Sequence, residues 1–231
     1  MVTGATGQLG RVVVRRYLEA GAHVAIAVRD SAKGEAMRAE LAALAGTPDE
    51  LRLLVLAADP SDAAAMERAV DEVVRRWGRL DVLANVAGGY LSGDSWDIAA
   101  IERQWDTNVR TAVVATAACL RPMRARGYGR IVSMGSFSAQ RGTKDNAGYA
   151  MAKTAILRWT ESLASAVKAD GITANAILPS IIDTPENRRD MPKADPSRWV
   201  SPDEIASLVL FLSSAEASGI TGAAIPAVGR V

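Results

Sequence analysis

The sequence has little cysteine, little net charge and no long apolar run, and each shortage excludes a class of protein. Among 231 residues there is one cysteine, Cys119, so an internal disulfide is excluded and a reducing compartment is expected. Cys119 lies in the apolar run AVVATAACL, which is typical of a packed helix rather than of a nucleophile. The formal net charge is +1, with acidic and basic residues interspersed, so no nucleic-acid partner is expected.

A membrane protein is not predicted either. No apolar run reaches the roughly 18 residues that a membrane span requires, and no signal peptide opens the chain. We therefore expect a soluble, cytoplasmic protein, and we predict no metal site.

Apolar runs with the length of strands alternate with helical patterns along the whole chain. Continuous apolar runs such as HVAIAV (23–28) are typical of parallel strands that are covered on both faces. The alternation predicts one α/β domain over residues 1–231, a Rossmann-type doubly wound parallel sheet with helices on both faces. The predicted strands are 1–3, 23–28, 51–57, 81–88, 131–134, 172–178 and 220–228, and the predicted helices are 9–20, 31–45, 61–77, 98–126, 149–168 and 202–213.

The first predicted strand is unusually short. The chain begins MVTGATG, so a glycine-rich turn follows two or three residues of possible strand, whereas a central parallel strand usually has about five. Either this strand is abbreviated, or residues that precede Met1 belong to it.

The glycine-rich turn predicts a phosphate site. Gly4, Gly7 and Gly10 form a G-x-x-G-x-x-G motif between the first strand and the first helix. Glycine permits a tight turn and the close approach of a pyrophosphate to backbone amides at a helix N-terminus. The alternative is a turn that is glycine-rich for packing alone.

The end of the second strand predicts which dinucleotide is bound. An NAD site places an acidic residue about 20 residues after the glycines, for the ribose hydroxyls. Here the strand ends at Val28, which accepts no hydrogen bond, and Arg29 follows, where it could pair with a 2′-phosphate. We expect NADP(H) to be favoured over NAD(H), the alternative being that Arg29 is a solvated surface charge.

A phenol, an ammonium and a hydroxyl come together in the stretch 131–159. Tyr149 and Lys153 are four residues apart, so on a helix they share one face, and Ser136 leaves the preceding strand where a loop can fold it back. A neighbouring lysine favours the phenolate and lowers the tyrosine pKa from about 10. Alternatively, the pair lies on an ordinary helix surface, because Y-x-x-x-K arises by chance in roughly one such chain in ten.

These motifs resemble those of the short-chain dehydrogenase/reductase family across essentially the whole chain. TGATGQLG (3–10) is similar to its cofactor turn, NVAG (85–88) to its N-N-A-G stretch, and Asp59 to the acid that contacts the adenine. The segment after the sixth strand is similar to the one that holds the nicotinamide carboxamide. The predicted cofactor contacts are Gly4, Thr6, Gly7, Gln8, Leu9, Gly10, Arg29, Asp59, Asn85, Ala87, Gly88, Tyr149, Lys153, Pro179, Ile182 and Thr184.

The resemblance also implies a catalytic set, Asn108, Ser136, Tyr149 and Lys153, and NAD(P)(H)-dependent hydride transfer to or from a carbonyl or an alcohol. Tyr149 is expected to be the acid or base, and Lys153 to lower its pKa and to bind the nicotinamide ribose. Ser136 would hydrogen-bond the substrate oxygen, and Asn108 would hold a water that resupplies protons.

Two alternative functions stay open. The stretches 86–90, 149–153 and 183–199 resemble quinonoid dihydropteridine reductase, which favours a reductase of quinonoid dihydropterin or a related heterocycle. The glycine spacing also resembles redox-sensor branches of the superfamily, which favours a non-catalytic NADP-binding sensor.

Substrate contacts and assembly are the last expectations. We expect 185–199 to be a substrate loop that closes over a small-molecule substrate, with Met191 and Trp199 as its apolar wall. The predicted helices 98–126 and 149–168 carry Trp105, Cys119 and Trp159 among small residues, and with the family resemblance they favour a homodimer or a homotetramer.

Overall fold

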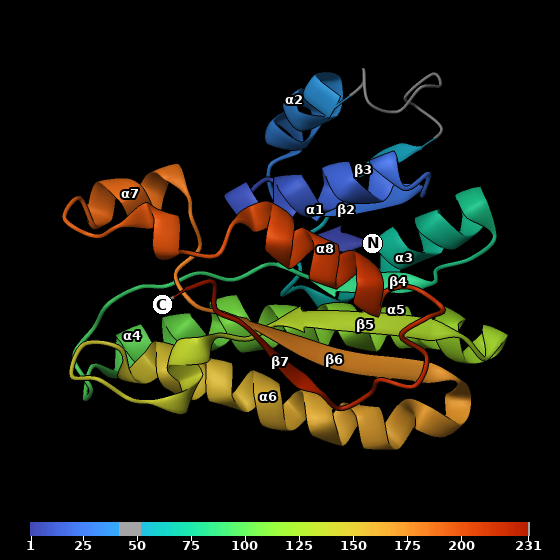
Figure 1. The fold of residues 1–231 in the computed structure, drawn as a ribbon. Helices are drawn as coiled ribbons and strands as arrows, with labels where there is room; N and C mark the ends of the chain where they lie inside the picture. The colour runs from blue at the N-terminus through green and yellow to red at the C-terminus, as the bar shows by residue number, and fades with distance from the viewer. Residues whose placement is uncertain (42–51, 231) are drawn as a thin grey trace.

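A computed structural model describes residues 1–41 and 52–230, and within these residues seven parallel strands form one sheet (Figure 1). The strand order is β3-β2-β1-β4-β5-β6-β7, so the order reverses between β1 and β4. In such a sheet a ligand binds at the carboxyl ends of the strands beside the reversal. The strands are β1 Val2–Thr3, β2 Val24–Val28, β3 Leu53–Ala57, β4 Val82–Asn85, β5 Gly129–Met134, β6 Ile172–Pro179 and β7 Ala224–Ala227.

Helices cover both faces of the sheet, as predicted. The buried side chains of α1, α2 and α8 join one hydrophobic core, and those of α3, α5 and α6 join the other. Helices α4 and α7 lie at the end of the molecule where the strands finish (Figure 1). The helices are α1 Gln8–Glu19, α2 Ser31–Leu41, α3 Ala63–Trp77, α4 Ile98–Trp105, α5 Thr111–Arg126, α6 Ala147–Val167, α7 Pro185–Asp190 and α8 Pro202–Leu212.

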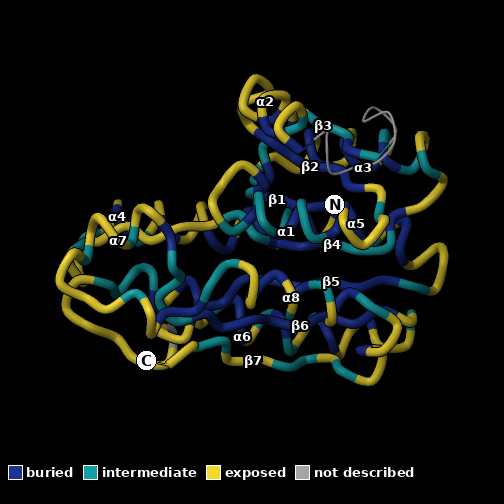
Figure 2. The backbone as a smooth tube through the Cα atoms, turned by 45° about the horizontal axis from the view of Figure 1, so that its top comes forward, coloured by how far each residue is buried: buried dark blue, intermediate teal, exposed yellow. Residues whose placement is uncertain are grey.

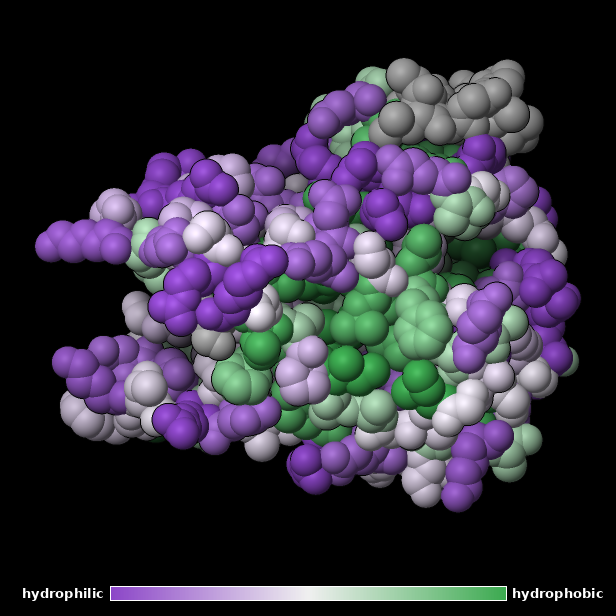
Figure 3. Space-filling model, viewed as in Figure 1, coloured by the Kyte–Doolittle hydropathy of each residue, from purple (hydrophilic) through white to green (hydrophobic). Residues whose placement is uncertain are grey.

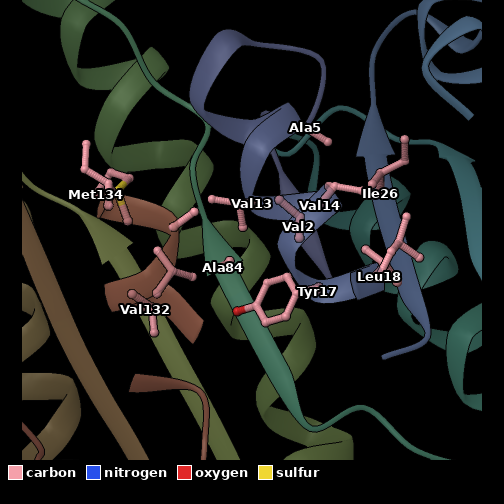
Figure 4. Close-up of a cluster of buried hydrophobic side chains, with 14 of the residues drawn as sticks. Val2, Ala5, Val13, Val14, Tyr17, Leu18, Ile26, Ala84, Val132 and Met134 are labelled. Carbon is pink, nitrogen blue, oxygen red and sulfur yellow. The ribbon is translucent and has the colours of Figure 1, made fainter. Parts of the chain in front are cut away.

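Strand β1 lies in the middle of the sheet although two residues form it. Val2 pairs with Ile26 on one side and with Ala84 on the other, so the short strand is enclosed by its neighbours. Figure 4 shows Val2, Val13 and Val14 packed together against β2 and β4, and Figure 2 shows the central strands as buried along their lengths. Tyr17 joins this core, and its hydroxyl bonds Ser213 Oγ at 2.6 Å.

The predicted boundaries differ from the structure where local chemistry overrides the apolar pattern. The fourth strand ends at Asn85 rather than at residue 88, because the chain turns there, with Val86 N donating to Ala84 O at 3.2 Å. The last strand covers 224–227 rather than 220–228. The predicted helix 31–45 is α2 as far as Leu41, and its remaining residues, like Leu51 of the third strand, lie outside the described residues.

Two further differences concern the site itself. The predicted helix 98–126 contains a π-helical turn, Asp106–Arg110, between α4 and α5, and such turns occur frequently at functional sites. The predicted loop 185–199 contains α7 and a short 3₁₀ turn, Pro196–Arg198. Among the residues described, no helix has both the length and the apolar character that crossing a membrane requires.

Candidate active site

The glycines of the first turn have different tasks. Gly4 has a φ of +65°, and a Cβ there would lie 2.5 Å from the backbone N of Ala87. A Cβ at Gly10 would collide with the carbonyl oxygen of Gly4. Both glycines are therefore required by the packing of the turn, whatever binds there.

Gly7, by contrast, is not required by the protein's own packing. A Cβ on Gly7 would meet Gly4 O at 3.4 Å, an ordinary contact, and its φ is −78°. Gly7 is the N-cap of α1 but makes no side-chain cap hydrogen bond, and the first turn of α1 has no acidic residue. Exposed Thr6 and Gln8 and half-buried Leu9 flank it. An uncapped helix N-terminus behind an exposed glycine fits a phosphate group.

The adenosine side of the site lies at the ends of β2 and β3. Arg29 is exposed directly after β2, and no ion pair joins it to any other described residue. Asp30 is occupied, since its Oδ1 accepts hydrogen bonds from the backbone N of Ala32 and of Lys33. Asp59, after β3, accepts two hydrogen bonds from Ser61 through the same oxygen, Oδ1.

In the stretch NVAG (85–88), the first side chain lies in the core and the following residues form the loop after β4. The side chain of Asn85 is buried and donates to Thr116 Oγ1 at 3.0 Å and to Ser133 Oγ at 3.3 Å. It therefore ties β4 to α5 and to β5, a structural role that the sequence did not predict, and its contact with a cofactor stays a prediction. The backbone N of Ala87 donates to Thr3 Oγ1 at 3.2 Å, so this stretch is fixed to β1.

Gly88 lies where Asn108 and Lys153 approach each other. A Cβ on Gly88 would lie 2.6 Å from Asn108 Oδ1 and 3.3 Å from Lys153 Nζ. Lys153 is buried, and its Nζ donates to the carbonyl oxygen of Met134, the last residue of β5, at 2.8 Å. The fold thus brings together residues from β5, α6, the π-helical turn and the loop after β4.

Ser136 and Tyr149 complete the predicted catalytic set. Ser136 is the N-cap of the 3₁₀ turn Phe137–Gln140, and its Oγ lies 2.8 Å from Ser138 Oγ. The Ser136 hydroxyl also lies close enough to Tyr149 to lower the pKa of its phenol. The fold therefore places Ser136 near Tyr149, Tyr149 beside Lys153, and Lys153 with Asn108 at Gly88.

The pKa values differ from the sequence-based expectation. Burial raises the pKa of Tyr149, with a smaller opposing effect of the Ser136 hydrogen bond. Burial also lowers the pKa of Lys153, to about 8. The expected net lowering of the Tyr149 pKa is not found in this structure, where burial dominates; the Lys153 ammonium bonds Met134 O and lies 5.7 Å from the Tyr149 ring centroid.

Sequence reasoning missed two neighbours of this set. Gln104 is buried one turn before Asn108, and its Oε1 accepts from Asn108 Nδ2 at 2.8 Å. The ring of Tyr90 contacts the Tyr149 ring edge-on, with 5.3 Å between centroids. The four-residue spacing of Gln104 and Asn108 on a predicted helix is a signal that could have identified the first.

The segment after β6 is anchored by its own hydrogen bonds. Pro179 ends β6 and is buried, Ile182 forms a bridge with Val200, and Thr184 Oγ1 caps α7 by accepting from Asn187 N at 3.2 Å. Trp199 is buried and Met191 is partly exposed, and their role as the wall of a substrate loop stays a prediction.

Helix α7 contacts the glycine-rich turn. Gln8 Nε2, at the start of α1, donates to Glu186 Oε1, in the first turn of α7, at 3.2 Å. Figure 3 shows a recess at the left end of the molecule, between the projecting part that carries α7 and the projecting part below it. The predicted catalytic residues lie toward the same end.

A cavity lies apart from this site. It has a volume of about 230 Å³ and is lined by Met1, Val24 and Val82, which are near the amino ends of their strands, and by His23 and Trp77. The described residues contain no group of three or more His, Cys, Asp or Glu side chains that could hold a metal ion.

Comparison with known proteins agrees with this geometry. Residues 4–229 match a family model described as enoyl-(acyl carrier protein) reductase. A cyclohexanol dehydrogenase from Rhodococcus sp. (strain TK6) is 30% identical, over 99% of this chain and 94% of the relative. A solved oxidoreductase of the short-chain dehydrogenase/reductase family from Burkholderia thailandensis is 30% identical, with a TM-score of 0.86, over 99% of this chain and 90% of that one. A solved NAD⁺-bound xylitol dehydrogenase is 26% identical, with a TM-score of 0.88, over 99% and 96% of the two chains.

These relatives also bear on the alternatives that the sequence left open. They are named as dehydrogenases or oxidoreductases, so neither a pterin reductase nor a non-catalytic sensor is favoured. The chain belongs to the short-chain dehydrogenase/reductase family and is an NAD(P)-dependent oxidoreductase that acts on an alcohol or a carbonyl group.

Proposed function

We propose that this enzyme reduces a carbonyl compound with NADPH and that Tyr149 is its proton donor. The observation that carries the proposal is the meeting of Asn108 and Lys153 at Gly88, after β4, with Tyr149 beside Lys153 and Ser136 close to Tyr149. A bound nicotinamide supplies the hydride.

Tyr149 and Ser136 handle the substrate oxygen. Because burial raises the Tyr149 pKa, the phenol is protonated at neutral pH and can donate its proton as the oxygen gains negative charge. The hydroxyl of Ser136, next to Tyr149, donates a second hydrogen bond to the same oxygen.

Lys153 and Asn108 support Tyr149. The Lys153 ammonium, fixed by Met134 O, stabilises the phenolate once the proton has left. The side-chain amide of Asn108 is occupied by Gly89 and Gln104, so the water that we assign to Asn108 would be held by its main-chain carbonyl.

Replacement of Tyr149 by phenylalanine tests the proton donor. Tyr149→Phe keeps the ring and removes the hydroxyl, so turnover should fall by about 10²- to 10⁴-fold, while the Kd for NADPH stays unchanged. The assay uses NADPH with a panel that contains cyclic ketones, 3-oxoacyl thioesters, quinones and quinonoid dihydropterin. Arg158→Gln, at an exposed side chain of the same helix α6, is the control for local disturbance. Full activity of Tyr149→Phe would rule out the proton-donor role.

We infer a preference for NADP(H) from the end of β2. Arg29 is exposed there and has no ion-pair partner among the described residues, whereas one carboxylate oxygen of Asp30 is engaged by the backbone at the start of α2. A free guanidinium is well suited to a 2′-phosphate.

Arg29→Ala should therefore raise the KM for NADPH by about 10- to 100-fold, the worth of a hydrogen bond to a charged group, and leave the KM for NADH nearly unchanged. Lys33→Ala is the matched control, because Lys33 is a nearby cation that lies 3.9 Å from Asp30. An equal effect of Arg29→Ala on both cofactors would contradict the assignment.

Assembly and location complete the proposal. We propose a cytoplasmic homodimer or homotetramer that acts on a small-molecule carbonyl or alcohol. Half-exposed apolar side chains on α4, α5 and α6 (Trp105, Val113 and Met151) support self-association. Cys119 is buried against the sheet and takes no part in such an interface. The presence of one cysteine in 231 residues, which excludes an internal disulfide, fits a reducing compartment.

A further inference from the structure

The side chains of Gln104 and Asn108 form a clamp on the loop that follows β4. The Nδ2 atom of Asn108 donates to Gly89 O at 3.1 Å, and its Oδ1 accepts from Gly89 N at 3.1 Å. Gln104 Nε2 donates to Leu91 O at 3.1 Å. Both polar side chains are about 1% exposed, so these hydrogen bonds are made out of water, where the loss of a partner is costly.

The clamp holds the residues on either side of Tyr90. Gly89 and Leu91 are each fixed through their backbone, and the hydroxyl of Tyr90 donates to Asp145 O at 3.4 Å. The same two loops are joined again where Gly93 N donates to Asp145 O at 3.2 Å. Tyr90 therefore stands between two tethered loops although its side chain is 55% exposed.

This arrangement places Tyr90 against the catalytic phenol. The two rings are nearly perpendicular, at 87°, with centroids 5.3 Å apart, which is a preferred geometry for an aromatic pair. The polar and titratable groups that face Tyr149 are Tyr90 from the loop after β4, Ser136 from the loop after β5, and Lys153 from its own helix.

We propose that Tyr90 is a positioning residue for Tyr149, and that buried Gln104, together with Asn108, holds Tyr90 in place. The proposal rests on the proposed role of Tyr149 as proton donor. The Tyr90 ring fixes the direction of the phenol and shields one edge of it from water, which helps to keep the phenol protonated until the substrate oxygen accepts the proton.

Kinetics of Tyr90 variants test this role. Tyr90→Ala removes the ring, so kcat should fall roughly 2- to 10-fold, the worth of an aromatic pair, with KM unchanged. The alkaline limb of the kcat profile should move to lower pH, because a less shielded phenol loses its proton more easily. Tyr90→Phe keeps the ring contact and should retain kcat within about twofold. Trp96→Ala, an exposed aromatic of the same loop, is the control and should change neither quantity.

Gln104 gives a second, independent measurement. Gln104→Leu removes the bonds to Leu91 and Asn108 and should shift the alkaline limb in the same direction as Tyr90→Ala, whereas Arg103→Gln, its exposed neighbour, should not. If Gln104→Leu fails to fold, the Tyr90 variants still test the proposal, because the Tyr90 side chain is exposed and its replacement leaves the core intact. A change in KM alone, or an unmoved alkaline limb in Tyr90→Ala, overturns the proposal. Activity of Tyr149→Phe would instead overturn the proposed function, so the two failures are distinguishable.

Discussion

The buried position of the Lys153 ammonium destabilises the folded protein. Its ammonium is buried, and the acceptor identified for it in the described part of the chain is Met134 O. The folded-state pKa of about 8 lies below the ordinary 10.5, so the folded protein holds this proton less well than the unfolded chain does. The cost is fully present below pH 8 and is lost as the pH rises from 8 towards 10.5.

Lys153→Met should therefore make an inactive but more stable protein. Removing the buried charge should stabilise the folded state by about 3 kcal/mol at most, the energy that corresponds to the pKa shift. Loss of the hydrogen bond to Met134 O offsets about 1 to 2 kcal/mol of this gain. The net gain in the free energy of unfolding is about 1 to 2 kcal/mol at pH 7, or roughly 2 to 8 °C in Tm for a chain of this size. Thermal unfolding followed by circular dichroism measures it.

The pH dependence of Tm shows whether the gain of Lys153→Met comes from the removal of a buried charge or from better packing of the methionine. The gain in Tm should shrink between pH 8 and pH 10, and Lys168→Met, at an exposed lysine after α6, should leave Tm unchanged. A Tm for Lys153→Met that is lower than the wild-type value at every pH would show that the buried ammonium is not a net cost.

At the scale of the element, helix α7 carries a carboxylate, that of Glu186, close to the proposed cofactor site. Glu186 accepts from Gln8 at the N-terminus of α1, so a carboxylate lies beside the place proposed for the pyrophosphate. A negative charge there repels a bound phosphate, since both compete for the positive end of the helix.

Glu186→Gln should therefore strengthen NADPH binding by about 2- to 5-fold at low salt, equivalent to 0.3–1 kcal/mol for one charge near a helix end. Fluorescence titration of NADPH gives the Kd, and the gain should diminish at high salt because the charges are exposed. Asp190→Asn, at the other end of α7, is the matched control. Weaker binding by Glu186→Gln would mean that the carboxylate helps to hold the cofactor.

The same elements show how far the sequence predicts the site. Periodicity located the strands and most helices because their residues are buried in regular patterns. The spacing of Tyr149 and Lys153 predicted that they share a helix, which the structure has, whereas the assignment of four catalytic residues came from the family resemblance and stays a prediction. Helix α7 was predicted as a loop because its six residues, a proline and five polar residues, bury no side chain, so no apolar period marks them.

Tertiary contacts explain the remaining differences. The pKa direction of Tyr149 depends on burial by residues far along the chain, which a four-residue spacing does not express. Likewise, the role of Asn85 depends on Thr116 and Ser133, in α5 and β5. Such contacts arise only when the sheet is assembled.

At the scale of the whole molecule, apolar surface remains on more than one face. Figure 3 shows apolar surface around α8 and β7, and Phe211 of α8 is 45% exposed. On another part of the molecule, Trp105 is 48% and Met151 is 53% exposed. Apolar groups that stay in water in the single chain become buried if copies associate through them, which favours the oligomer.

Light scattering coupled to gel filtration should therefore give the mass of a dimer or a tetramer. Trp105→Glu places a charge in the interface proposed on α4, α5 and α6, where burying it without a partner costs several kcal/mol, so the assembly should lose that contact and become smaller. Phe211→Glu tests the α8 face in the same way, and the exposed, distant Lys33→Glu is the control. Circular dichroism of each variant must match the wild type, so that a smaller mass reports a lost contact and not an unfolded chain. If the wild type is a monomer at the concentration of the activity assays, self-association through either face is refuted.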